Sequence, residues 1–294
     1  MQSSRPIESD IVLLGAGHAH VEVLRRFAMQ PEPGLRLTLI GREPETPYSG
    51  MLPGLLRGEY RHAEAHIDLA PIAAAAGARL ILAEATAIDL AAREVVIAGR
   101  PNIGFDLLSI DVGGLPAMPD DTGTGVKPIG RFLDKLERLE GELPEHARVA
   151  IVGGGAAGAE LALALAVRFA GRFRLALVCG APDPVPSAPA SARRTIREAL
   201  TEAEVELACG VTAGTLANGK LALSDGTFLD ASAALWATNV RGPAMLAAAG
   251  LDCDEHGCVR VDGMLRSLSH KFVFAAGDCA AVQGKPRPKA GVWA

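Results

Sequence analysis

The sequence predicts an α/β fold that is built twice along one chain of 294 residues. In two stretches, apolar segments typical of buried strands alternate with segments of helical periodicity in the same order. Each stretch opens with an apolar run that leads into a glycine-rich turn, Ile11–Leu14 before Gly15 and Val149–Val152 before Gly153. Strands that alternate with helices form parallel sheets covered by helices. We therefore expect two such sheets.

Both turns have the composition that a bound dinucleotide requires. They read Gly15-Ala16-Gly17-His18-Ala19-His20 and Gly153-Gly154-Gly155-Ala156-Ala157-Gly158-Ala159-Glu160. A bare backbone avoids a clash with a pyrophosphate, and the following helix points free N–H groups and its positive dipole end at the phosphates. Each turn follows a strand and precedes an apolar helix, as the pattern demands. We expect two Rossmann-like dinucleotide-binding domains, the layout of an enzyme that passes a hydride between a nicotinamide and a flavin.

The remaining elements repeat in the same order. The first stretch is expected to contain strands over 11–14, 35–40, 79–83 and 105–110, a helix over 68–76 and a β-hairpin of 87–90 with 94–98. The second is expected to contain strands over 149–152, 174–178, 204–207 and 233–237, a helix over 191–200 and a hairpin of 211–216 with 220–223. The second hairpin turns on Asn218-Gly219, a strong short turn signal. Each predicted domain therefore carries an inserted hairpin or meander.

The domain boundaries follow from composition. Residues 113–148 are rich in Pro, Gly and Asp before a short amphipathic helix over 131–140, which is typical of a crossover between domains. The segment from about residue 251 is expected to return and complete the first domain. We therefore predict a discontinuous first domain over 1–117 and 251–294 and a second domain over 118–250.

Composition excludes several classes of protein. Hydrophobic residues make up 49% of the chain and charged residues 21%, which is typical of a globular protein with a sizeable core. A net charge of −5 provides no basic face for nucleic acid. The polar start does not resemble a secretory signal, and no apolar run reaches the roughly 18 residues that span a bilayer. Because the five cysteines are scattered and odd in number, we expect a cytoplasmic location.

Three motifs and three shorter strings carry a family resemblance. The two glycine turns together with Val273-Phe274-Ala275-Ala276-Gly277-Asp278 resemble those of the FAD-dependent pyridine nucleotide-disulfide oxidoreductases, the group that contains disulfide reductases and type II NADH dehydrogenases. The strings over 18–24, 47–54 and 288–292 are similar to a subgroup that includes the flavoprotein module fused to some selenide, water dikinases. The resemblance implies two cofactors, FAD and NAD(P)H, and hydride transfer between them.

The resemblance also implies which residues bind the cofactors. In the first domain the FAD-binding candidates are Gly15, Gly17, His18, Ala19, Glu43, Gly277, Asp278 and Lys289. Gly15 and Gly17 would cradle the pyrophosphate, and Asp278 would accept a hydrogen bond from a ribityl hydroxyl. In the second domain the NAD(P)-binding candidates are Gly153, Gly155, Ala156, Gly158 and Glu160, of which Glu160 would lie close to the nicotinamide.

Some positions depart from the family pattern. His20 replaces the third glycine of the first turn, where close packing of helix and strand normally excludes a side chain. Glu43, the candidate for binding the adenosine ribose, lies two positions beyond the place at the strand end where the family often carries this acid. The corresponding stretch of the second domain, Leu177 to Gly180, has neither an acid for NAD nor an arginine for the NADP phosphate. Relatives continue beyond the point where this chain stops, so we expect a truncated C-terminal region.

No redox-active cysteine pair is expected beside the flavin. The loop with Tyr48, Ser49 and Pro53, our candidates for lining the isoalloxazine, contains no cysteine, and a plain turn is the alternative for it. Cys253 and Cys258 flank what reads as an exposed turn, and Cys279 is expected to be buried and inert. His62 and His66 are four residues apart, but no further ligand completes a metal site, and Asp68 is expected to be a helix N-cap instead, so no metal is expected.

The leading hypothesis is an FAD-dependent NAD(P)H oxidoreductase that passes electrons to a small acceptor such as a quinone. The alternative is a flavin-binding accessory module linked to selenium metabolism, a partner of selenide, water dikinase with little turnover of its own. A third reading is a nucleotide-binding protein whose second site is vestigial. Nucleic acid is excluded as a partner, whereas membrane contact and homodimer formation stay open.

Overall fold

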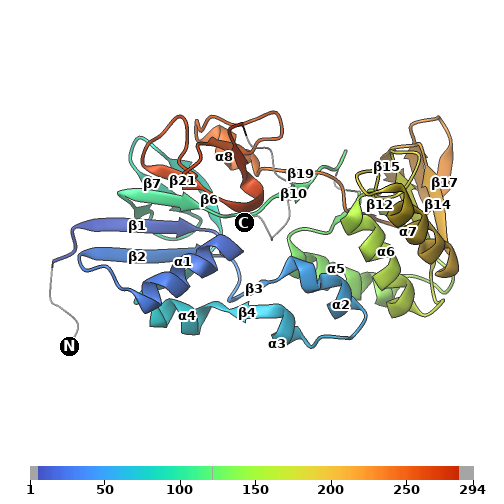
Figure 1. Ribbon diagram of the computed structural model, residues 1–294, viewed down its shortest axis with the longest axis horizontal. Coiled ribbons are helices and arrows are strands. Elements are labelled where there is room, and N and C mark those ends of the chain that lie inside the picture. Colours follow the sequence, from blue (N-terminus) through green and yellow to red (C-terminus); the bar gives the residue numbers. More distant parts are fainter. Residues whose placement is uncertain (1–5, 121, 285–294) are drawn as a thin grey trace. The chain divides into compact units, whose positions relative to one another are not determined.

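The computed structural model describes residues 6–120 and 122–284, which form two compact units. Unit 1 comprises Met1–Tyr48, His66–Gly114 and Val240–Ala294, and unit 2 comprises Ser49–Ala65 and Leu115–Asn239. Each unit has a parallel sheet covered by helices on one face and by antiparallel strands on the other, which is the predicted α/β fold (Figure 1). The assignment of FAD to one unit and NAD(P) to the other stays a prediction.

The sheet of unit 1 contains five parallel strands in the order β21-β9-β1-β2-β5. Their bounds are β1 (Ser9–Leu14), β2 (Leu35–Gly41), β5 (Arg79–Leu82), β9 (Leu107–Ile110) and β21 (Val273–Ala275). Strands of a parallel sheet are buried on both faces and so read as continuous apolar runs, as Val12, Leu13 and Leu14 do. The late segment β21 pairs with β9, with Ala275 opposite Ile110, so the chain returns to this sheet as the sequence predicts.

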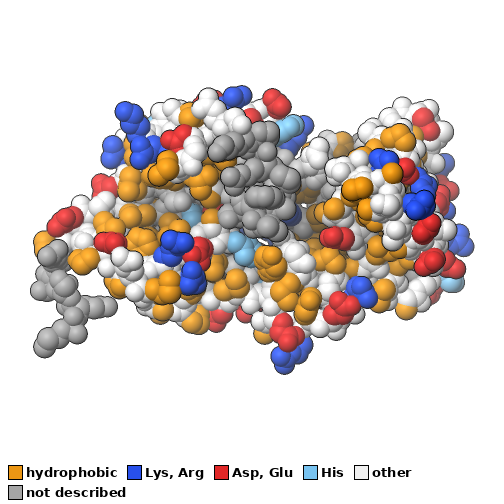
Figure 2. Space-filling view, viewed as in Figure 1, with side chains coloured by type: hydrophobic (Ala, Val, Ile, Leu, Met, Phe, Trp, Pro, Cys, Tyr) orange, Lys and Arg blue, Asp and Glu red, His pale blue; other side chains and the backbone are white. Residues whose placement is uncertain are grey.

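Helices cover one face of this sheet. Leu24 of α1 (His18–Met29) and Leu69 of α4 (Leu69–Ala75) pack on Leu13, Leu37 and Leu39. Charged side chains gather over α1 (Figure 2), where Glu22 pairs with Arg25 and Arg26 at 2.7 and 2.9 Å. The Asp68 carboxylate accepts a hydrogen bond from Ala70 N at 2.9 Å, which confirms the predicted N-cap of α4.

The other face packs on antiparallel strands and short elements. The predicted hairpin is confirmed as β6 (Ala85–Asp89) with β7 (Glu94–Ile97), joined by β8 (Ile103–Gly104). Its buried side chains form one core with those of Val12, Leu14 and Ile110. The short elements of unit 1 are β3 (Glu45–Pro47), β4 (His66–Asp68), β19 (Val240–Arg241), α8 (Ala244–Ala248), β20 (Val259–Val261), η2 (Gly277–Cys279) and β22 (Ala280–Val282).

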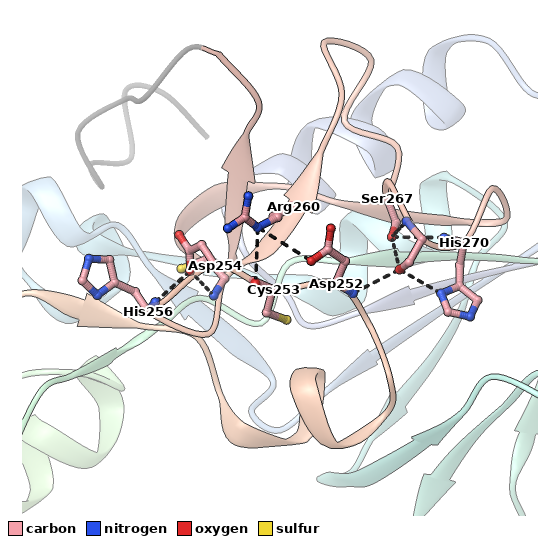
Figure 3. A network of polar contacts seen from close by, with 9 residues as sticks. Asp252, Cys253, Asp254, His256, Arg260, Ser267 and His270 are labelled. Carbon is pink, nitrogen blue, oxygen red and sulfur yellow. Dashed lines mark hydrogen bonds and ion pairs between the residues drawn. The ribbon is translucent and has the colours of Figure 1, made fainter.

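A polar network fixes the segment that leads back to β21 (Figure 3). The Asp254 carboxylate accepts hydrogen bonds from His256 N at 3.0 Å and Cys258 N at 2.8 Å, which closes a turn. Arg260 donates to Cys253 O at 3.3 Å and lies 3.7 Å from Asp252. These bonds pair polar groups of the turn between Cys253 and Cys258, so the network stabilises the conformation of this segment.

Unit 2 repeats the same sheet, in the order β11-β18-β12-β13-β14. Its strands are β11 (Thr124–Gly125), β12 (Arg148–Val152), β13 (Arg174–Cys179), β14 (Val205–Cys209) and β18 (Ala233–Trp236). One face packs on α5 (Ile129–Glu142), α6 (Ala156–Phe169) and α7 (Ala190–Glu202). None of the helices among the described residues is long and apolar enough to span a bilayer.

The opposite face of this sheet carries the second predicted meander. It consists of β15 (Ala213–Ala217), β16 (Lys220–Leu223) and β17 (Phe228–Asp230). Asn218 and Gly219 both have positive φ, 51° and 73°, which a two-residue hairpin turn requires. The sequence therefore predicted this turn correctly.

Residues 49–65 group with unit 2, whereas the predicted boundaries put them in the first domain. This segment contains η1 (Ser49–Met51), α2 (Leu52–Leu56) and α3 (His62–Ala65). Leu56 is 2% exposed and belongs to the same core cluster as Phe132 and Leu165. Apolar packing of α2 is therefore the reason for the grouping. The strand β10 (Leu115–Pro116) also belongs to unit 2.

Candidate functional site

In unit 1 the predicted FAD-binding residues gather at the carboxyl edge of the sheet. Gly15 follows β1, and Asp111 follows β9, the strand beside it on the other side from β2. The strand order reverses direction between β1 and β9, and ligands of such sheets bind outside the carboxyl ends at this switch point. The first glycine turn therefore lies where a nucleotide site is expected.

The backbone of the first turn depends on glycine. Gly15 has a φ of 93°, and a Cβ there would lie 2.2 Å from Asp111 O. Gly17 is the N-cap residue of α1, and as a glycine it has no side chain to cap the helix. His18 is the first residue of α1, and its Nε2 is buried without a hydrogen-bond partner among the described residues. A buried ring nitrogen of this kind is available to a ligand.

His20 fills the place of the third glycine with a fully satisfied ring. It is 1% exposed, with Nδ1 2.6 Å from Gly15 O and Nε2 2.8 Å from Ser109 Oγ. Because a carbonyl oxygen only accepts, Nδ1 carries the proton, and Nε2 of the neutral ring accepts a hydrogen bond from the Ser109 hydroxyl. Burial lowers the pKa of His20, although Asp111 and the Gly15 carbonyl act in the opposite direction.

The start of α1 already holds a carboxylate from its own chain. Asp111 is 3% exposed, and its Oδ2 accepts hydrogen bonds from Ala19 N at 3.0 Å and His20 N at 3.3 Å. A Cβ on Gly17 would lie 2.2 Å from the same oxygen, so glycine makes room for the carboxylate. Burial raises the pKa of Asp111, while His20, the two N–H groups and His18 lower it.

The other predicted FAD residues lie around this edge. Glu43 is half-buried in the segment after β2, and Gly277 and Asp278 form η2 directly beyond β21. The ring of Tyr48 lies edge-on to His18 with centroids 5.0 Å apart. Ser49 and Pro53, the other candidates for lining the isoalloxazine, belong to unit 2. Lys289 lies outside the described residues.

In unit 2 the second turn repeats the backbone of the first. Gly153 has a φ of 125°, and a Cβ there would lie 2.5 Å from Ala237 O, which follows the neighbouring strand β18. Gly158 allows α6 to approach so closely that a Cβ would lie 1.7 Å from Gly153 O. Close packing of helix on strand is the role of the third glycine in such turns.

The start of α6 is open, unlike that of α1. Gly155 is its N-cap residue without a side-chain cap, and a Cβ there would meet no atom within 4 Å. Gly155 and Ala156 are exposed, so the free N–H groups of the first turn are accessible. Glu160 is exposed on the same helix. This arrangement can accept an anion.

Cysteine occupies the end of β13, where an acid for the ribose is absent. Cys179 is 1% exposed, and a Cβ on Gly154 would lie 2.0 Å from its Sγ. Its thiol therefore covers the turn and donates to Asp183 O at 3.3 Å. Cys209 is its register partner on β14.

The remaining cysteines have structural contacts. Cys279 is buried and donates to Ala276 O at 3.2 Å, and buried Cys258 donates to Asp278 O at 3.4 Å. All five cysteines are free thiols. Within residues 6–120 and 122–284, no group of three His, Cys, Asp or Glu side chains could hold a metal ion.

Asp111 is the functional candidate that sequence reasoning missed. It directly follows the predicted strand over 105–110. The repeated element order aligns that strand with the one over 233–237, in which Ala237 corresponds to Asp111. This alignment of the two halves could have singled it out, because a buried strand that ends in a carboxylate beside a glycine turn is unusual.

Comparison with known proteins supports the same assignment. The family described as pyridine nucleotide-disulphide oxidoreductase matches residues 9–292. An NADH dehydrogenase-like protein of Mycobacterium tuberculosis is 30% identical over 237 residues, which cover 74% of this chain and 59% of that protein. Demethylphylloquinone reductase of Synechocystis is 28% identical over 213 residues, which cover 67% of this chain and 53% of that protein.

The fold is also that of solved structures. The NAD-dependent persulfide reductase from A. fulgidus superposes with a TM-score of 0.80 at 19% identity, over 97% of this chain and 57% of that one. The chain thus spans less than two thirds of the length of each of these three proteins.

Proposed function

This chain belongs to the pyridine nucleotide-disulphide oxidoreductase family, and on that basis we propose that it is an FAD-dependent NAD(P)H oxidoreductase. Unit 1 binds FAD and unit 2 binds NADH or NADPH, and the two nucleotides together supply hydride transfer from nicotinamide to flavin. The observation that carries the proposal is the repeated turn. Each unit has a bare glycine turn and a helix start at the switch point of a parallel sheet.

The proposed roles in unit 1 rest on position and chemistry. Gly15 and Gly17 cradle the pyrophosphate, the backbone of Ala19 contributes to the helix start, and the buried Nε2 of His18 is a hydrogen-bond donor for a phosphate oxygen. Asp278 on η2 accepts a hydrogen bond from a ribityl hydroxyl. Gly277, Glu43 and, outside the described residues, Lys289 complete the proposed set.

The proposed roles in unit 2 rest on the open start of α6. Gly153, Gly155 and Gly158 keep the turn bare. Because the N-cap residue of α6 is glycine, it has no side chain that could cap the N–H groups of the first helical turn. Glu160 on the same helix stays the candidate for contact with the nicotinamide. The protein residues thus bind and orient the nucleotide.

For the electron acceptor we propose a small molecule such as a quinone, reached without a redox cysteine pair. The segment with Tyr48, Ser49 and Pro53 lacks cysteine, and one similar protein is a demethylphylloquinone reductase. A cytoplasmic location is part of the same proposal.

The test is an absorbance spectrum of the purified protein followed by anaerobic titration with NADH and then NADPH. We expect flavin bands near about 370 and 450 nm that bleach with one of the two nucleotides. Flavin that stays oxidised with both would contradict the oxidoreductase and favour the accessory flavin module. Protein that binds no flavin would contradict both.

A charge at the start of α6 tests the site in unit 2. Ala156→Asp places a carboxylate at the first position of the helix, which suits the helix dipole but repels a pyrophosphate. We expect at least a tenfold higher NAD(P)H concentration for half-maximal flavin reduction. Ser191→Asp is the matched control, because it adds the same charge near the exposed start of α7. Equal effects of both variants would contradict the site.

A further inference from the structure

The carboxylate at the start of α1 is a charge that the turn itself does not need. Asp111 N donates to Leu14 O at 2.8 Å, and Gly15 N donates to Ile40 O at 2.8 Å. Unit 2 makes the same two bonds from Ala237 N to Val152 O at 2.8 Å and from Gly153 N to Val178 O at 2.9 Å. Alanine therefore builds the same junction. The side chain of Asp111 is an addition to it.

That addition competes with the anion that the turn is expected to bind. Oδ2 of Asp111 takes the N–H group of Ala19 and shares that of His20 with Gly17 O, so it occupies donors at the helix start. A pyrophosphate requires the same donors and the same positive end of the helix dipole. Two anions at one buried helix start repel each other strongly, because little water screens them.

Within residues 6–120 and 122–284, no Lys or Arg side chain acts on the Asp111 carboxyl to offset this repulsion. The charges that act on its carboxyl are those of His20 and His18, both on α1, and burial lowers the pKa of each ring. His20 also has both ring nitrogens engaged in the neutral form. The segments that follow the neighbouring strands β21 and β2 carry carboxyl groups, Asp278 on η2 and Glu43, rather than cations. The neutral acid is therefore the form of Asp111 that is compatible with a bound diphosphate.

We propose that Asp111 couples dinucleotide binding in unit 1 to proton uptake: the protein takes one proton from solvent onto the Asp111 carboxyl when a pyrophosphate occupies the start of α1. The proton forms an O–H bond on the carboxyl, and no electrons move. The protonated group becomes a donor that can face a phosphate oxygen. This inference rests on the proposed binding of FAD by unit 1.

The sign of the effect follows from the linkage. The free protein holds Asp111 ionised at alkaline pH, whereas the complex holds it protonated, so FAD affinity falls as pH rises. We expect the Kd for FAD to increase by up to about tenfold per pH unit between pH 7 and 9. The raised pKa of Asp111 in the free protein reduces the slope at the lower end of this range.

The experiment measures FAD binding to the full chain, freed of flavin, by quenching of flavin fluorescence at constant ionic strength. Asp111→Asn should bind FAD more tightly than wild type at pH 9 and with no pH dependence. Asp106→Asn is the matched control, because Asp106 is exposed at the opposite end of β9 and accepts a bond from Asp10 N. This control should keep the wild-type slope.

Proton uptake by the wild-type protein is a second measurement that does not depend on a variant that folds. Calorimetric titration with FAD at pH 8 in two buffers of different ionisation enthalpy should give an uptake of about one proton per FAD. FAD binding without proton uptake, or an unchanged slope in Asp111→Asn, would overturn the inference alone. Absence of FAD binding at every pH in wild type and in Asp111→Asn would overturn the proposed function as well.

Discussion

The glycine turns of unit 1 and unit 2 share one backbone, and two of their differences in side chain change the start of the helix. In both, a glycine of positive φ packs on the carbonyl of the residue after the neighbouring strand, Asp111 in one case and Ala237 in the other. The place of the third glycine of the motif is taken by His20 in unit 1 and by Gly158 in unit 2. The helix start holds a carboxylate in unit 1 and is open in unit 2. The sheet thus determines the turn, while single side chains decide what the helix start can accept.

The third position shows two ways to join a helix to its turn. In unit 2, α6 comes so near that no Cβ fits at Gly158. In unit 1 the Cβ of His20 fits, and its ring bonds Gly15 O and Ser109. The helix α1 must therefore be seated differently on its turn, with a hydrogen-bonded ring in place of direct backbone contact. Four variants test this and the other differences between the two units.

The largest effect is expected for Gly158→Ala. The new Cβ would meet the carbonyl of Gly153, which cannot move without breaking the turn, so we expect a loss of at least about 3 kcal/mol in the free energy of unfolding. Urea unfolding followed by circular dichroism measures it. Gly155→Ala is the control, because open space surrounds that position and its φ is −74°. A loss of about 1 kcal/mol or less is expected there. Equal losses would contradict close packing at Gly158.

The second effect is expected for His20→Gly, which gives unit 1 the third residue of unit 2. The variant removes a buried ring and both of its hydrogen bonds, and glycine weakens a helix. We expect unfolding to require about 2–3 kcal/mol less free energy, measured with urea. Ala19→Gly adds glycine to the same turn of α1 and keeps the ring, so its cost should be about 1 kcal/mol. If both variants cost the same, the ring contributes nothing.

The third effect is expected for Ala237→Asp, which gives unit 2 the carboxylate of unit 1. Binding of NADH or NADPH should weaken as pH rises from 7 to 9, by up to about tenfold per unit, whereas wild-type binding should stay flat. Quenching of nucleotide fluorescence gives the Kd. Ala217→Asp on β15 adds the same charge at an exposed position and should leave binding pH-independent. A pH slope in the control, or none in Ala237→Asp, would break the comparison.

The smallest effect is expected at the far ends of the two helices. Ala170 ends α6 in a left-handed conformation with a φ of 47°, whereas Gln30 ends α1 with a φ of −138°. Ala170→Gly should stabilise the protein by about 1 kcal/mol, because glycine adopts positive φ without steric cost. Gln30→Gly should give no gain. A thermal unfolding scan separates the two outcomes.

The sequence alone determined the local parts of this protein. The strand and helix order, both glycine turns, the hairpin at Asn218-Gly219 and the N-cap Asp68 were predicted and confirmed. Each of these depends on periodicity or backbone preferences within a few residues. The return of the late segment to the first domain was also predicted, and in the structure its strand β21 pairs with β9.

Only the tertiary structure decided which side chains meet at the sites. Asp111 lies more than ninety residues from Ala19 and His20, yet its carboxylate bonds both. The same holds for His20 with Ser109, and for Leu56, which packs in the core of unit 2. The physical reason is that neighbours at the edge of a parallel sheet are set by strand order, which brings together residues far apart in the chain. Local patterns carry no record of that order, so the hydrogen bonds of Asp111 to the start of α1 became visible only in the folded protein.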